Sequence, residues 1–184
     1  MLLKRFLITI VIFSWSTGIA SGPAPSDPVY IRINNGYMGV YAHGDEYAEF
    51  LFTGSDIRLQ DPYHIFLKQR LGMMVTFADK SQFAPGAGML ASHGEWELNY
   101  WRQHAAKAES TVRNDLSGGG SDLRVTEITL TNAAGTQTKV YTVALAAKDG
   151  VFVLSIAPAE SSIDPLVVNI ASSFKMVHRP LDPG

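Results

Sequence analysis

Three side chains that could ligate a metal ion lie on one face of a helix predicted in the middle of the chain. His93, Glu97 and His104 are four and seven residues apart, so at about 100° per residue they fall within a narrow arc. His104 lies about 10 Å further along the helix axis than Glu97, whereas direct ligands must lie within about 2.3 Å of a metal. The spacing therefore predicts neither a metal site nor a bound cofactor, and we interpret the arc as the border of the buried face.

A pair of large aromatic side chains marks the opposite face of the same helix. Trp96 and Tyr100 are four residues apart, and Gln103 and Lys107 continue that face. Aromatic side chains that point away from a core often mark interaction surfaces. We therefore expect these four residues to bind a partner protein, the alternative being that residues 23–28 or 78–91 of the chain itself cover them.

Patterns typical of catalytic residues are missing from the sequence. The chain has no cysteine, which excludes a thiol nucleophile, and it has no Gly-x-Ser-x-Gly motif. Glycosidases need two carboxylates about 5–10 Å apart, and the scattered acidic residues cannot be paired from sequence. The glycines at 118–120 follow a helix and precede a strand, the reverse of the order in a phosphate-binding loop. No catalytic residue is predicted.

The predicted helix that carries these side chains spans residues 92–116. Ser92 and Glu95 have the spacing of a capping box, no proline follows, and the glycines at 118–120 end the pattern. Apolar residues recur every three or four positions, which predicts one buried stripe. Its members are Leu98, Trp101, Ala105, Ala108, Val112 and Leu116.

Strands are predicted on both sides of this helix, because β-branched and aromatic residues alternate between turn residues. Before the helix they cover 29–33, 37–42, 46–53, 63–68 and 73–77, with a loop at 78–91. After it, a meander covers 123–131, 136–147 and 151–157, followed by a helix capped by Ser161 or Ser162 and a short strand at 175–177. Strands and helices that do not alternate favour an α+β domain, here residues 29–179, with an antiparallel sheet and the helices on one of its faces.

The first 20 residues have the pattern of a secretory signal peptide. Lys4 and Arg5 precede an apolar run at 6–15, and the small residues Gly18 and Ala20 follow. The run is shorter than the roughly 20 residues that span a bilayer. We expect cleavage, a flexible lead-in at 21–28 and a bacterial periplasmic or secreted protein without stable membrane insertion; an uncleaved anchor is the alternative.

The charge balance excludes some partners. The full chain has a net charge of −2; without residues 1–20, which hold two of the 15 basic residues and none of the 17 acidic ones, it is −4. A mildly acidic domain lacks the basic face that nucleic acids and anionic membranes require.

The second half of the chain resembles the PsbP-like family over roughly residues 63–178. The similarity lies in the order of elements: a helix from Ser92, a meander over 123–157 and a closing segment at 167–174. The Pro-x-x-Trp segment that often follows the first strand of that family is missing. The resemblance implies an α-β-α sandwich and a non-catalytic accessory or binding role, with no functional residues to carry over.

Taken together, the sequence predicts an exported, non-enzymatic protein that docks a partner protein in the cell envelope. The role would be that of an immunity protein that neutralises a toxin or of an accessory subunit of a complex. The alternative is a small exported hydrolase whose site has no recognisable pattern.

The first testable prediction concerns export. We expect the mature protein to begin near Ser21, because the apolar run at 6–15 precedes small residues suited to cleavage. N-terminal sequencing and the intact mass of the exported protein measure this directly. Full-length chain in the membrane fraction would contradict it.

Overall fold

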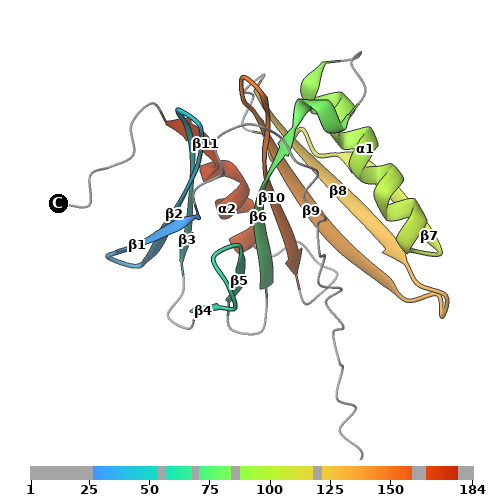
Figure 1. The fold of residues 1–184 in the computed structure, drawn as a ribbon. Coiled ribbons are helices and arrows are strands. Elements are labelled where there is room, and N and C mark those ends of the chain that lie inside the picture. The colour runs from blue at the N-terminus through green and yellow to red at the C-terminus, as the bar shows by residue number, and fades with distance from the viewer. Residues whose placement is uncertain are drawn as a thin grey trace, which may run out of the picture.

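The fold is built mainly from strands arranged in two antiparallel sheets (Figure 1). The computed structural model describes residues 27–53, 57–67, 71–83, 88–117, 122–158 and 165–177. Of these residues, 56% lie in strands and 21% are helical. The predicted α+β sandwich with a long central helix, PsbP-like or otherwise, is therefore wrong.

The smaller sheet has four strands in the order β1-β2-β3-β11. Its strands are β1 (Val29–Ile33), β2 (Gly36–His43), β3 (Glu46–Thr53) and β11 (Lys175–Val177). The first three strands follow one another through tight turns. The last strand returns from the other end of the chain to pair with β3 through residues 47–49.

The larger sheet has seven strands in the order β4-β5-β6-β10-β9-β8-β7. The strands before the long helix are β4 (Ile57–Leu59), β5 (His64–Leu67) and β6 (Leu71–Asp79), and those after it are β7 (Lys107–Val112), β8 (Leu123–Thr131), β9 (Gln137–Ala146) and β10 (Gly150–Pro158). A short 3₁₀ helix, η1 (Lys80–Gln82), follows β6. Among the described strands, β4 and β7 are the two edges of this sheet.

One face of the larger sheet packs against the smaller sheet and the second helix. Side chains alternate along a strand, so Phe152 of β10 points to this side, where its ring meets Tyr41 of β2 at 5.7 Å and Phe77 of β6 at 5.1 Å. Helix α2 (Pro165–Ser173) lies between the two sheets (Figure 1). Its Val167 and Ile170 are fully buried in the same core.

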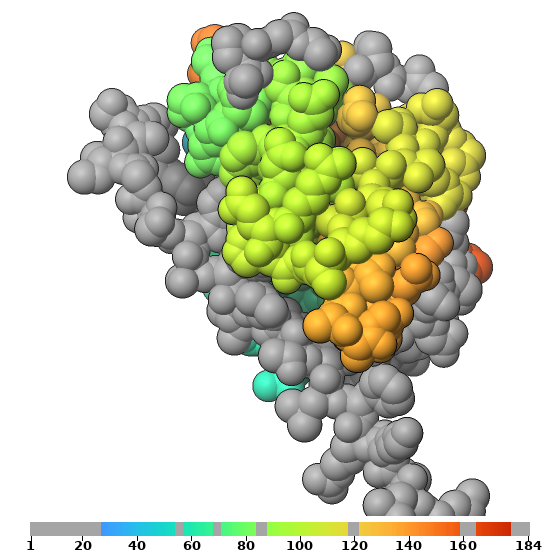
Figure 2. Space-filling view, turned by 90° about the vertical axis from the view of Figure 1, so that its right-hand side faces the viewer, coloured from blue at the N-terminus to red at the C-terminus, as the bar shows by residue number. Residues whose placement is uncertain are grey.

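The other face of the larger sheet carries the long helix α1 (Met89–His104) (Figure 2). A second apolar cluster joins them, in which Trp96 of α1 packs against Ala144 of β9 and Val151 and Val153 of β10. The two helices thus lie on opposite sides of the sheet, which corrects the expectation that both pack on one face. No helix within the described residues is long and apolar enough to cross a membrane.

The helix predicted over residues 92–116 is in fact a shorter helix followed by a strand. Helix α1 begins at Met89, so Ser92 lies inside it and does not cap it. It ends at His104, because Ala105 adopts an extended backbone with φ −125° and ψ 155°. Strand β7 then pairs with β8, and its Ser110, Thr111 and Val112 are poor helix formers. The predicted apolar stripe is therefore divided between two elements.

Most other predicted elements are confirmed, with small shifts of their ends. The strands predicted at 29–33, 37–42, 46–53, 63–68 and 73–77, the meander and the strand at 175–177 all form. The predicted loop at 78–91 is wrong at both ends, where β6 and α1 extend into it. The signal peptide at 1–20, residues 21–26 of the lead-in and the caps Ser161 and Ser162 lie outside the described residues.

Two glycines in the β6–β10 ladder supply the second prediction. A Cβ at Gly150 would overlap the backbone carbonyl oxygen of Ala78 and come within 2.7 Å of the Phe77 ring. The backbone of β6 cannot move aside as a side chain could. Gly150→Ala should therefore lower the free energy of unfolding by about 1–3 kcal/mol. The matched control is Gly72→Ala in the same ladder, where the nearest atom, on the Phe66 ring, is 3.6 Å away.

Urea unfolding of the two variants measures the difference. Only Gly150→Ala should lower the unfolding midpoint strongly. Equal midpoints for the two variants would show that β6 and β10 are further apart at Gly150 than the structure places them.

Candidate functional site

The layer between α1 and the sheet contains an unusual number of polar side chains. Only two residues of α1 are buried, and both are titratable: His93 is 2% exposed and Glu97 is 8% exposed. They face Thr126 of β8 and Thr142 of β9, which lie opposite each other in the ladder and are also buried. Alternation along β8 brings Arg124 to the same face. We call these five residues the polar layer.

Glu97 is held in the polar layer by a hydrogen bond and not by an ion pair. The Thr142 hydroxyl donates to its Oε1 at 2.7 Å. Burial raises the pKa of Glu97 from 4.5 to about 7, because a low-dielectric surrounding disfavours the charged carboxylate. Below that pH the side chain is a neutral acid.

His93 is neutral for the same reason. Its ring lies edge-on to Phe83 and beside Trp96, each with a centroid distance of 5.8 Å. Its buried Nδ1 has no hydrogen-bond partner among the described residues. Burial, together with the positive charge of Arg124, lowers the pKa of His93 from 6.5 to about 4.

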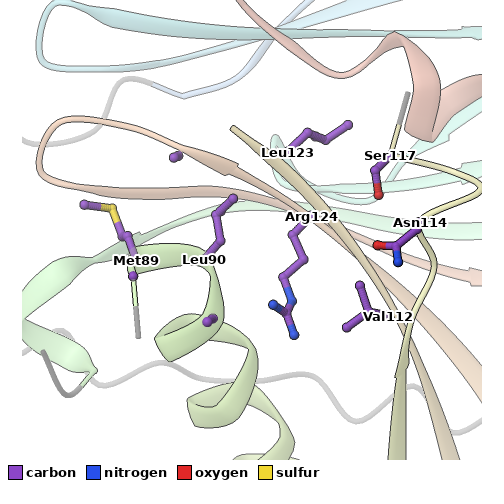
Figure 3. A pocket seen from close by; sticks show the side chains of 10 residues that line it. Met89, Leu90, Val112, Asn114, Ser117, Leu123 and Arg124 are labelled. Atoms are coloured by element: carbon purple, nitrogen blue, oxygen red, sulfur yellow. The ribbon is translucent and has the colours of Figure 1, made fainter. Parts of the chain in front are cut away.

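Arg124 connects the polar layer to an open pocket of about 420 Å³ at the start of α1 (Figure 3). The side chain extends from β8 between the first turns of α1 and Val112 of β7. Its Nε lies 3.5 Å from the position that a Cβ on Gly94 would occupy, so the guanidinium packs across this glycine. The pocket is lined by Gly88, Met89, Leu90, Ala91, Val112, Asn114, Ser117, Leu123, Arg124 and Ala146.

The Arg124 guanidinium lacks the partners that other partly buried charges have. Its buried Nε makes no hydrogen bond to any described residue, and no described carboxylate forms an ion pair with it. Arg113, at the end of β7, by contrast contacts Asp115 at 2.7 Å and Glu127 at 2.6 Å. Glu127 also pairs with Lys139. The pocket therefore holds an uncompensated cation beside a fully compensated charge network.

The lining of the pocket is suited to binding and not to acid–base catalysis. Among the described lining residues Ser117 is the only one with a hydroxyl, and none is a His, Asp or Glu that could act as a base for it. The Ser117 hydroxyl also donates to the backbone carbonyl of Arg113 at 3.1 Å. Within the described part of the chain, no three His, Asp or Glu side chains are grouped closely enough to hold a metal ion.

The four residues predicted to form a binding face do not lie together on one helix face. Trp96 packs toward the sheet, which corrects the prediction that it points outward. Tyr100 is half-buried and stacks on His104 with a centroid distance of 4.1 Å. Gln103 is exposed near the end of α1, and Lys107 lies in β7, where it pairs with Glu109 at 2.8 Å. Of the arc His93, Glu97 and His104, only the first two are buried.

Sequence reasoning missed Arg124 and the pocket. Alternation within β8 places Arg124 and Thr126 on one face and Leu123 and Val125 on the other. This alternation can be seen in the sequence alone. Recognising the pocket also required knowing that α1 covers the first of these faces and ends early enough for β7 to form its second wall.

No protein-family model, curated protein or solved structure matches the chain. The resemblance to the PsbP-like family therefore stays a prediction. The geometry of the described residues is the basis of the functional argument.

The third prediction concerns the pH dependence of stability. The raised pKa of Glu97 contributes stability that is complete below pH 4.5 and is lost as pH rises through about 7. The lowered pKa of His93 contributes stability that is complete above pH 6.5 and is lost as pH falls through about 4. Between pH 4.5 and 6.5 the two contributions have opposite slopes and largely cancel.

Single variants should separate the two contributions. Relative to the unmodified protein, Glu97→Gln should gain up to about 3 kcal/mol as pH rises from 4.5 to 7, and His93→Gln should gain stability as pH falls from 6.5 to 4. The exposed Glu95→Gln on the same helix is the control. Urea unfolding across this pH range measures the slopes, and parallel curves for all variants would contradict the shifted pKa values of Glu97 and His93.

Proposed function

We propose that the chain is an exported, non-enzymatic binding protein that docks a partner protein in the cell envelope through the pocket between α1 and β7. The observation that carries the proposal is an open pocket of about 420 Å³ that contains an arginine without a partner among the described residues. Arginine set among apolar side chains is typical of residues that dominate protein–protein binding energy.

The walls of the pocket support a protein ligand. Met89 and Leu90 provide apolar surface, while Asn114 and Ser117 provide polar groups at the opposite wall. At the rim, Val112 is 40% exposed on the edge strand of the larger sheet. A mixed surface next to an edge strand suits a peptide segment of another protein.

A hydrolase is less well supported. The lining residues contain no base for Ser117, and the two titratable residues nearby, His93 and Glu97, are buried in the polar layer. Export itself rests on the signal-peptide pattern at residues 1–20 and belongs to the proposal.

Site-specific photocrosslinking in the native host is the fourth prediction. A benzoylphenylalanine at Val112, on the rim, should crosslink one defined partner. The control is the same residue at Leu59 of β4, which is 48% exposed at the other edge of the same sheet and should not capture that partner. Mass spectrometry of the product distinguishes a toxin from a subunit of an envelope complex.

A second variant ties the crosslink to the pocket. Ala91→Phe narrows the pocket without changing its charge and should abolish the product from position 112, while thermal unfolding verifies that the variant is folded. Equal products from positions 112 and 59, or none from position 112, would refute docking at this surface.

A further inference from the structure

We infer that the pocket recognises a carboxylate side chain of the partner protein, which pairs with the Arg124 guanidinium. This inference rests on the proposed docking function and names the chemistry of the group that enters the pocket. It follows from the position of Arg124, the composition of the lining and the charge pairs elsewhere in the structure.

The guanidinium of Arg124 is half-buried and always charged. It offers five N–H donors in a fixed plane, and its Nε is inaccessible to solvent and has no partner among the described residues. A buried donor without a partner costs roughly 1–3 kcal/mol, and more if it is charged. A ligand removes that cost if one of its oxygens reaches the Nε–H and accepts from it.

The described residues cannot supply the missing carboxylate themselves. No Asp or Glu is among the described residues that line the pocket. Glu97, the acid of the polar layer, accepts a hydrogen bond from Thr142 and forms no ion pair with Arg124. Glu127, on the neighbouring part of β8, points to the other face of the sheet and is saturated by Arg113 and Lys139. None of the described carboxylates therefore supplies the complementary charge, and we assign it to a ligand.

The lining favours a carboxylate over a phosphate. Arg124 is the single cationic side chain among the described lining residues, and it balances one negative charge and not two. The planar guanidinium fits a carboxylate with two parallel hydrogen bonds. The apolar side chains of Leu90 and Val112 flank it and suit the methylene groups of a Glu or Asp residue in a peptide. A phosphate would leave a charge uncompensated against these walls.

A matched pair of peptides tests the inference on the whole mature protein, from Ser21 to Gly184. The probes are acetyl-Ala-Glu-Ala-amide and its neutral counterpart acetyl-Ala-Gln-Ala-amide, with acetate and inorganic phosphate as further arms, at constant ionic strength. Backbone amide shifts of Asn114 and Ser117 and the side-chain Nε–H signal of Arg124, followed by NMR, report binding. The Glu peptide should bind at least about tenfold more tightly than the Gln peptide, as expected for hydrogen bonds to a charged group.

The protein variants separate a specific pair from general charge attraction. In Arg124→Met the preference for Glu over Gln should vanish, in Arg124→Lys it should fall in part, and in the exposed Arg58→Met it should be unchanged. Unfolding curves verify that each variant is folded. Equal binding of the two peptides, a Glu preference that survives in Arg124→Met, or tighter binding of phosphate than of the Glu peptide would each overturn the inference.

The outcome is separable from that of the crosslinking experiment. If the Val112 crosslink forms but the Glu peptide shows no preference, the docking function stands and the carboxylate inference fails. If acetate binds as tightly as the Glu peptide and Val112 captures no partner, the pocket takes a free small acid, and docking of a protein side chain is refuted.

Discussion

The ladder formed by β10 with β6 and β9 is the constraint on which the rest of the structure depends. Most residues of β9 and β10, 13 of 19, are buried, because these strands are covered on both faces. Phe152, Leu154 and Ile156 face the smaller sheet and α2, whereas Val151 and Val153 face α1. A shift of one residue in register would exchange these two sets. The close approach at Gly150 holds the register at one end of the ladder.

The two layers on either side of this ladder differ in chemistry, and the difference explains where binding can occur. The inner layer consists mainly of aromatic and aliphatic side chains, and the charged residues on that side, Arg113, Glu127 and Lys139, form ion pairs with one another. The layer under α1 combines small residues such as Ala144 with the polar layer, so α1 is held partly by a hydrogen bond between Glu97 and Thr142. Both titratable side chains remain neutral there near pH 6, which leaves Arg124 as the single charge of the polar layer.

Local patterns in the sequence predicted the strands well and the site poorly. Hairpins and the meander follow from alternation between turn residues, and those signals are local. The end of α1 carries no such signal, because Ala105 and Ala106 suit a helix and the apolar spacing continues into β7. The face of α1 that packs on the sheet was also misjudged, since His93 and Glu97 are buried against threonines, and apolar periodicity cannot identify a polar interface. Because of these errors the pocket could not be predicted, since it forms only when α1 is short and a strand follows it.

Two arginines on neighbouring segments differ in the charged partners that the fold gives them. Arg113 and Arg124 belong to the two sides of the β7–β8 pair, where the Arg113 N–H bonds to the carbonyl of Val125, next in sequence to Arg124. On the inner side, Arg113 meets two carboxylates, one of which also binds Lys139. On the side of α1, Arg124 meets a glycine, a neutral histidine and an open pocket. The same local backbone thus places one guanidinium in a charge network within the chain and the other beside an open pocket, where we propose that it donates to a carboxylate of a partner protein.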